Sequence, residues 1–261
     1  MILLAVSPHL DDAAFSAGGT LAQQASGGHE VVVATAFTRS VPDPQGFALR
    51  CQTDKGIAPE ADYMALRRNE DRAACAVLGA EPVWLDLPEA PHRGYASPEA
   101  LFGGVLPHDA GLWREVLARL RALVAARRPD TLLTCQGLGN HVDHLHVIRA
   151  VAALGAETGL PVAWWRDLPY AMRSPAAAPA PGLSDGLEPL AVALSPEALS
   201  AKLDACAAYA TQLHYQFGRD AEGDPTALMR QRLAAFAEAE GGASGGPAER
   251  WLAPGGRVPG S

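Results

Sequence analysis

Short apolar runs alternate with stretches of helical periodicity over the first two thirds of the chain. The apolar runs, several of them rich in β-branched residues, cover residues 2–7, 30–37, 83–85, 131–135 and 161–165. Helical spacing covers residues 12–24, 62–79, 110–127 and 144–154, and Gly79 is a typical helix C-cap. Runs that are apolar on both faces are typical of parallel strands covered on both sides. The pattern predicts one α/β domain, with a Rossmann-like, mainly parallel sheet and helices on both faces.

Three long segments interrupt this alternation, at residues 38–61, 88–109 and 173–185. Loops of this length in a compact domain usually form lids or binding loops, or are disordered. Two more helices are expected at residues 196–213 and 225–240, and a Gly/Pro-rich, partly extended C-terminal tail at 241–261. We find no internal repeat and no second domain.

Composition and charge indicate a globular protein and argue against nucleic acid or a membrane as its partner. With 261 residues, 48% hydrophobic and 19% charged, the chain is typical of a globular domain with a large core. The net charge is −8 and no basic stripe is present, so neither nucleic acid nor an anionic membrane is an expected partner. No apolar stretch reaches the roughly 18 residues of a membrane span, and the apolar start lacks the basic leader of a signal peptide. We therefore expect a cytoplasmic protein whose four scattered cysteines are free thiols.

The first chemically informative string is Pro8-His9-Leu10-Asp11-Asp12, directly after the first apolar run. In open α/β sheets, ligands bind outside the carboxyl ends of the strands, where this string would lie. The i, i+3 spacing lets His9 and Asp12 bind one ion, and zinc accepts both donor types. Asp11 would then be free to act on a water molecule. The alternative is that one of the aspartates only caps the following helix.

The second string, His141-Val142-Asp143-His144, follows the run at residues 131–135 and so reaches the same crevice. His144 could complete a His-Asp-His ligand set, since catalytic zinc sites use three protein ligands and one open position. His141, as an imidazolium, could stabilise an oxyanion or protonate a leaving amine, and Asp143 could hold its tautomer. His146 is expected to face away, because i+2 residues do not share a helix face. The alternative for this string is a helix N-terminus with surface histidines.

Two other classes of function are possible for these strings. A nucleotide-binding turn needs G-x-G-x-x-G directly after the strand, but Gly18 and Gly19 lie well inside the next segment and the strand exit is acidic. A non-catalytic metal- or sugar-binding module would keep the ligands and lose the base, whereas this chain keeps Asp11. Both alternatives are weaker than the hydrolase interpretation.

The two strings resemble those of a known family, the LmbE-like or PIG-L zinc deacetylases, in its P-H-x-D-D branch. These enzymes hydrolyse N-acyl groups on amino sugars and related thiol-conjugate amides. The resemblance is looser elsewhere: the similar segments are Gly18–Ala22, Arg67-x-x-Glu70, Leu78-Gly79, Leu85–Glu89, Asp167–Ala171 and Lys202 with Tyr209-x-x-Gln212.

The resemblance implies a role for each matching residue. The metal ligands would be His9, Asp12 and His144, and the catalytic residues Asp11 as general base, His141 on the oxyanion or acid side, and Asp143 orienting it. Arg67 matches an arginine that contacts the sugar, and Glu89 an acidic substrate contact. The implied cofactor is Zn²⁺, although Fe²⁺ or Mn²⁺ also suits a His-His-Asp set.

The chain departs from the family pattern at three positions. Leu10 and Val142 replace a proline found in many members, and Gly139 stands where some members carry a tyrosine. Tyr170 is the tyrosine that we consider in its place.

The expected substrate is an N-acetyl amino sugar or another sugar-containing small-molecule amide, with a mycothiol-like thiol conjugate or a glycosylated natural product as alternatives. The loops at 38–61 and 88–109 would decide between them. Trp84, Trp164, Trp165 and Trp251 could stack on a sugar, although the first three are expected to be core residues of strands. A homo-oligomer is possible.

Overall fold

A computed structural model describes residues 1–183, 185–218, 222–242 and 245–258. The described residues form one seven-stranded sheet in the order β3-β2-β1-β4-β5-β7-β6. The strands are β1 (Ile2–Ser7), β2 (Glu30–Phe37), β3 (Ala80–Leu87), β4 (Thr131–Cys135), β5 (Val162–Trp165), β6 (Glu188–Ala193) and β7 (Ala248–Ala253). The first five pair in parallel, whereas β7 is antiparallel to both β5 and β6. The α/β, mainly parallel sheet predicted from the sequence is confirmed.

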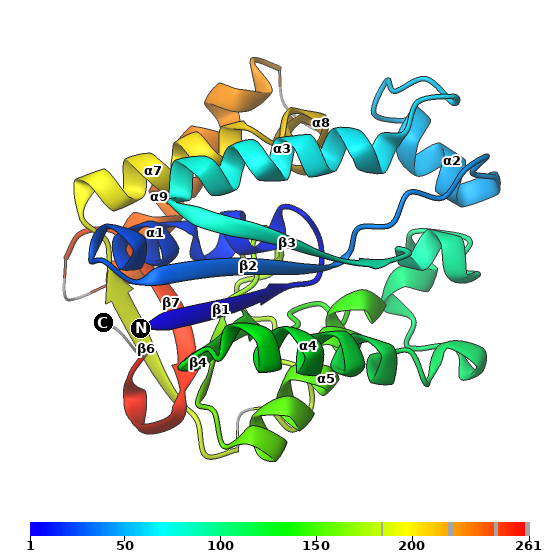
Figure 1. Cartoon of the computed structure of the whole chain (residues 1–261). Coiled ribbons are helices and arrows are strands. Elements are labelled where there is room, and N and C mark those ends of the chain that lie inside the picture. The colour runs from blue at the N-terminus through cyan, green and yellow to red at the C-terminus, as the bar shows by residue number, and fades with distance from the viewer. Residues whose placement is uncertain (184, 219–221, 243–244, 259–261) are drawn as a thin grey trace.

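Helices cover both faces of this sheet (Figure 1). On one side lie α1 (Asp12–Ser26), α3 (Tyr63–Leu78), α7 (Pro196–Ala207) and α9 (Pro225–Gly241), and on the other α4 (Trp113–Arg127) and α5 (Val142–Thr158). Three shorter helices are α2 (Gly46–Thr53), α6 (Tyr170–Arg173) and α8 (Ala210–Leu213). The main core lies between the sheet and these layers and includes most of β1, β2 and β4. No helix in the described ranges is long and apolar enough to cross a membrane.

The strand order reverses between β1 and β4. From β1 the chain proceeds outward to β2 and β3, and from β4 it proceeds in the opposite direction to β5. The loops that leave two such neighbouring strands diverge, which opens a crevice at their carboxyl ends. His9 follows β1 and His141 follows β4, so the topology brings both sequence strings to this crevice.

The C-terminal segment 241–261, expected to be a Gly/Pro-rich, partly extended tail, contains a strand that was not predicted. Its residues 248–253 form β7, an interior strand between β5 and β6, while residues 243–244 and 259–261 lie outside the described part of the chain. Neither β7 nor β6 was predicted, because both are six residues long and carry polar or proline positions among their apolar ones.

Smaller differences concern element bounds. The loop 38–61 contains α2, and the segment 88–109 contains only short 3₁₀ turns. The helix expected at 196–213 ends at Ala207, and α5 begins at Val142, so that His141 is its N-cap. In the segment 173–185, residue 184 lies outside the described residues. Each of the four cysteines is a free thiol, as predicted.

A buried ion pair joins β7 to α7, and hydrogen bonds to the same carboxylate join β7 to α1. The Glu249 carboxylate accepts a hydrogen bond from Lys202 Nζ (2.6 Å), from the main-chain N–H groups of Gly19 and Thr20, and from the Thr20 hydroxyl. The side chains of Lys202 and Glu249 are both about 2% exposed. The acidic side chain therefore orders the last strand against the first helix.

Glu249→Ala is expected to destabilise the fold by about 3–5 kcal/mol, because it leaves the buried Lys202 ammonium without its carboxylate. Urea unfolding followed by circular dichroism measures the change. Arg121→Ala serves as a control, since it breaks an exposed ion pair with Glu157 and should leave the midpoint unchanged. An equal, negligible shift for both variants would contradict the role given to Glu249.

Candidate metal centre and active site

Three side chains from the two strings meet at the crevice. One oxygen of Asp12, Oδ2, lies 3.2 Å from His9 Nδ1 and 3.2 Å from His144 Nε2. His9 precedes α1, Asp12 is its first residue, and His144 lies in the first turn of α5. These three residues form one of the groups among the described residues whose donor atoms could hold a metal ion. The structure thus brings the predicted ligand set together.

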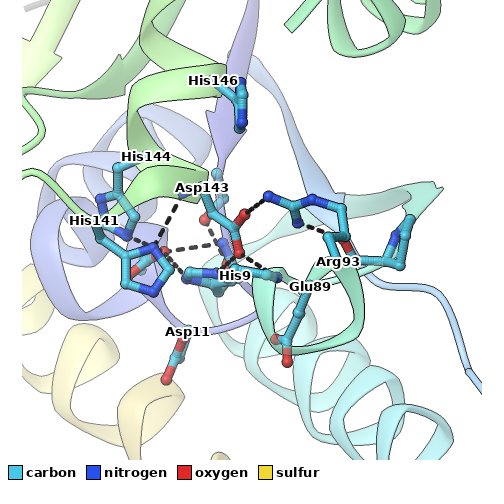
Figure 2. Close-up of polar contacts among 12 residues, drawn as sticks. His9, Asp11, Glu89, Arg93, His141, Asp143, His144 and His146 are labelled. Atoms are coloured by element: carbon cyan, nitrogen blue, oxygen red, sulfur yellow. Dashed lines mark hydrogen bonds and ion pairs between the residues drawn. The ribbon is translucent and has the colours of Figure 1, made fainter. Parts of the chain in front are cut away.

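Each of the two histidines is held from behind by a carboxylate. His9 Nε2 lies 2.9 Å from Asp143 Oδ2, and His144 Nδ1 lies 2.9 Å from Asp167 Oδ1 (Figure 2 shows the first pair). Metal-binding histidines usually donate their second ring nitrogen to such a partner, which fixes the ring orientation and raises the basicity of the ligand. Both rings are therefore arranged with one nitrogen on a carboxylate and the other directed at Asp12.

The donor chemistry of this group fits a divalent metal. His144 Nε2 is buried and finds no hydrogen-bond partner of acceptable geometry within the described ranges, despite its proximity to Asp12. A buried ring nitrogen without a partner is costly unless an ion binds it. The pKa of Asp12 lies well below its usual range, because the charge of His144 and the hydrogen bond and charge of His9 outweigh its burial.

A second possible grouping, Cys135 with His144 and Asp167, is less suitable for a metal. The second oxygen of Asp167 already accepts the main-chain N–H groups of Gln136 and Gly137 at 2.9 Å. The side chains of Cys135 and Asp167 are buried in the interior, and of the three only His144 also meets His9 and Asp12 at the crevice. We interpret this group as the support that orients His144.

Asp11 faces a buried arginine rather than capping the helix. It occupies the N-cap position of α1, yet its side chain makes no capping hydrogen bond to any described residue. Its Oδ1 instead accepts from Arg67 Nη2 at 3.2 Å, while Arg67 Nη1 donates to Glu89. Burial and the negative charges of Asp12 and Glu89 raise the pKa of Asp11, although the charge of Arg67 opposes the shift. A carboxyl group with a raised pKa in a cleft is typical of a general base.

His141 differs from the expectation in two respects. Its Nδ1 accepts a hydrogen bond from the main-chain N–H of Asp143 (3.2 Å), whereas the Asp143 carboxylate contacts His9 and Arg93. Asp143 therefore sets the tautomer of His141 through its backbone, and the ring proton lies on Nε2. Burial lowers the pKa of His141 to about 3, so the ring is neutral at pH 7 and not an imidazolium.

A cavity of about 240 Å³ opens beside these groups. The site residues that line it are His9, Asp11, Asp12, Arg67, Glu89, His141 and Asp143. Other lining residues come from the segments that the sequence marked as long loops, from α6 and from the region after α7, with Phe47, Pro91, Phe102, Tyr170 and Tyr215 among them. No tryptophan is among the described residues that line it; Trp164, Trp165 and Trp251 are buried in the core.

Tyr170 lies next to Gly139, where some relatives were expected to carry a tyrosine. A Cβ placed on Gly139 would come within 3.3 Å of Tyr170 Cδ1, and Gly139 has a φ of 83°, which disfavours other residues. The Tyr170 ring also packs edge-on against His144, with 5.4 Å between ring centroids. The ring of Tyr170 thus occupies the space beside residue 139.

His146 does not join the site, as expected for a residue two positions from His144. Its Nε2 lies 3.1 Å from Asp109 Oδ2 (Figure 2 shows the ring turned away from His144). The sequence did not single out Asp167, Arg93 or Asp109 as site residues. Asp167 was noticed only within a segment similar to the family, and nothing in the local pattern marks the other two.

This fold and site define a class of protein: α/β enzymes that bind a divalent metal with histidine and aspartate at the carboxyl edge of a sheet. The model of the PIG-L family, GlcNAc-PI de-N-acetylase, matches residues 4–154. The chain belongs to this family, whose match includes β1, β4 and both sequence strings.

Characterised relatives share this family's activity. The chain is 34% identical over 170 residues to 2'-N-acetylparomamine deacetylase of Streptomyces fradiae, a match that covers 64% of this chain and 57% of that protein. It is 30% identical over 241 residues to 1D-myo-inositol 2-acetamido-2-deoxy-alpha-D-glucopyranoside deacetylase of Actinosynnema mirum, covering 81% and 80% of the two chains. The chain therefore spans a little over half of the first relative and four fifths of the second.

Solved structures of related enzymes have the same fold over nearly the whole chain. The A40926 pseudoaglycone deacetylase Dbv21 superposes with a TM-score of 0.80 at 32% identity, covering 96% of each chain. A teicoplanin deacetylase in complex with teicoplanin superposes with a TM-score of 0.81 at 29% identity, covering 97% of this chain and 98% of that one. A further structure of teicoplanin deacetylase Orf2 is described as its zinc-inhibited form.

Proposed function

We propose that this protein is a metal-dependent N-deacetylase that hydrolyses the N-acyl group of an amino sugar within a larger small molecule. One observation carries the proposal: the donor atoms of two histidines and an aspartate converge on one point. A further carboxylate, Asp11, lies beside them in an open cavity and is not part of that ligand set. Family membership and the deacetylase relatives support the same reaction class.

The proposed ligands are His9, Asp12 and His144, and the proposed ion is Zn²⁺. The donor set suits zinc and leaves a position open for substrate, although Fe²⁺ fits the same donors. When bound, such an ion polarises a carbonyl oxygen and lowers the pKa of water. The hydrogen bonds to Asp12 and Asp143 raise the pKa of His9 to about 9, against the effect of burial. His9 is therefore protonated at pH 7 without the metal, and metal binding must displace a proton.

The chain's own groups would handle the protons of amide hydrolysis. Asp11 takes a proton from the attacking water as the oxygen of that water bonds to the amide carbon. The Nε2–H of neutral His141 donates to the carbonyl oxygen as that oxygen gains negative charge. The proton held by Asp11 then passes to the amine nitrogen as the C–N bond breaks. Arg67 keeps Asp11 in place and, with Glu89, lines the cavity where the sugar would bind.

The relatives suggest which molecules to test. The names of the two relatives give 2'-N-acetylparomamine and 1D-myo-inositol 2-acetamido-2-deoxy-alpha-D-glucopyranoside as their substrates, and one structural neighbour is a teicoplanin deacetylase in complex with teicoplanin. A cavity of about 240 Å³ accommodates one sugar ring, so the remainder of such a molecule would extend along the loops at its mouth. Amide cleavage in a sugar-containing thiol conjugate is the alternative within the same chemistry. The cytoplasmic location and a homo-oligomeric state stay predictions.

Purified protein is expected to contain one equivalent of metal and to release acetate from at least one of these N-acetyl amino sugars. Elemental analysis measures the metal, and an enzyme-coupled acetate assay measures the release. Removal of the ion by a chelator should abolish release, and Zn²⁺ or Fe²⁺ should restore it. Bound metal with no hydrolysis of any panel member would instead favour a non-catalytic sugar-binding module.

A further inference from the structure

Arg93 lies behind the proposed metal centre, in the segment 88–109, and takes no part in the chemistry above. Its side chain is 8% exposed. Nη2 donates to Asp143 Oδ1 at 2.7 Å and to Asp109 Oδ2 at 2.9 Å, and Nη1 donates to the main-chain oxygen of Pro88 at 2.7 Å. The guanidinium group also lies over the Phe37 ring, 5.0 Å from its centroid. A planar, five-donor group is thus held on all sides.

The contact with Asp143 connects Arg93 to a proposed metal ligand. The Asp143 carboxylate is fully buried and uses its two oxygens differently. Oδ1 accepts from Arg93, whereas Oδ2 accepts from His9 Nε2 and from the main-chain N–H of Ala90 (Figure 2). The hydrogen bond from His9 and the charge of Arg93 keep the pKa of Asp143 below its usual range despite its burial. Because Arg93 holds Oδ1 and Ala90 N–H donates to Oδ2, the carboxylate is fixed with Oδ2 facing His9 Nε2.

Asp109 holds the other side of the arginine. It accepts from Arg93 Nε (3.1 Å), from the Tyr95 hydroxyl (2.9 Å) and from His146 Nε2 (3.1 Å). His146 and Asp143 both belong to α5, so Arg93 and Asp109 join the segment 88–109 to this helix. The same segment supplies Glu89, Pro91, Pro98, Leu101 and Phe102 to the cavity wall.

We propose that Arg93 is a positioning residue: by fixing the Asp143 carboxylate, it orients His9 for metal binding and ties the cavity wall at 88–109 to the metal centre. The proposal rests on the metal site of the proposed function. A buried carboxylate that loses a charged hydrogen-bond partner is costly. Without Arg93, the Asp143 carboxylate would therefore rotate or shift to find another donor. Rotation of Asp143 would release His9 Nε2 and with it the direction of Nδ1.

The test is zinc affinity, measured by competition with a chromophoric chelator on apo-protein that circular dichroism shows to be folded. Arg93→Met is expected to bind Zn²⁺ about 10–100-fold more weakly, the usual cost of losing an orienting partner of a metal ligand. Arg93→Lys is expected to bind several-fold more weakly, because one ammonium cannot reach Asp143, Asp109 and Pro88 together. Should Arg93→Met fail to fold, Arg93→Lys decides the question.

Three further variants separate positioning from general destabilisation. Tyr95→Phe removes a hydrogen bond from the same cluster without touching Asp143, and its zinc affinity should equal that of the wild type. Asp143→Asn should itself weaken binding, and adding Arg93→Met to it should cause no further loss, because Arg93 acts through Asp143.

Unchanged zinc affinity in folded Arg93→Met would overturn the proposal. If Arg93→Met does not fold, unchanged zinc affinity in Arg93→Lys would overturn it. Additive losses of zinc affinity in the double variant would also overturn it. These results differ from failure of the proposed function, in which the wild-type protein itself would bind no zinc or would hydrolyse no member of the panel.

Discussion

Asp11→Asn is expected to keep one equivalent of metal and to lose acetate release by about 10²–10⁴-fold, the range over which a positioned general base accelerates a reaction. Asparagine has nearly the same shape and can still accept a hydrogen bond from Arg67, but it cannot take a proton from water. Arg67 keeps its ion pair with Glu89, so no buried charge is left alone. The measurements are elemental analysis and kcat for the best substrate of the panel.

Glu89→Gln is the matched control for this variant. It removes the negatively charged partner on the other side of Arg67 and leaves Asp11 in place. If Glu89 contacts the substrate, this variant should therefore show a raised KM with kcat nearly unchanged. An Asp11→Asn protein that retains kcat would contradict the assignment of Asp11 as the base. Loss of metal in that variant would indicate that Asp11 is itself a metal ligand.

His144→Ala is expected to abolish stoichiometric metal binding and, with it, all hydrolysis. The residue is fully buried, and its Nε2 is the unpartnered atom that lies 3.2 Å from Asp12 Oδ2. His9→Ala should behave alike, because it removes the second nitrogen donor. Elemental analysis of the purified variants, together with a circular dichroism spectrum, checks the outcome.

His146→Gln provides the comparison within the same helix. This histidine is also buried and lies two residues further along α5, but it contacts Asp109 rather than Asp12. Its replacement should leave one equivalent of metal bound. If His146→Gln lost the ion and His144→Ala kept it, the ligand set derived from the geometry would be wrong.

The positions of the two chemical strings could be predicted because the relevant signals are local. The apolar runs before His9 and before His141 identify two strands, and the polar residues that follow mark their carboxyl ends. Parallel strands in an α/β fold present those ends at one edge, so the convergence of His9, Asp12 and His144 required no knowledge of packing.

The elements that escaped prediction lack such signals. β7 has the sequence Ala-Glu-Arg-Trp-Leu-Ala beside a Gly/Pro-rich stretch, and its burial depends on pairing with β5, where Trp165 lies opposite Trp251. Its glutamate is stable in the interior because Lys202 and the middle of α1 meet it there. Contacts of this kind are set by the assembled fold and leave no periodicity in the chain.

The sequence by itself determined the fold class, the edge of the sheet that carries the chemistry, and the residue types that could bind a metal, because strand exits and donor spacing are properties of short segments. Only the tertiary structure decided how the supporting groups are used. The Asp143 carboxylate contacts His9, 134 positions away, and not the neighbouring His141 that spacing had favoured. Asp167 and Arg93 became visible as supports for the same reason: the direction of a buried side chain depends on which distant groups surround it.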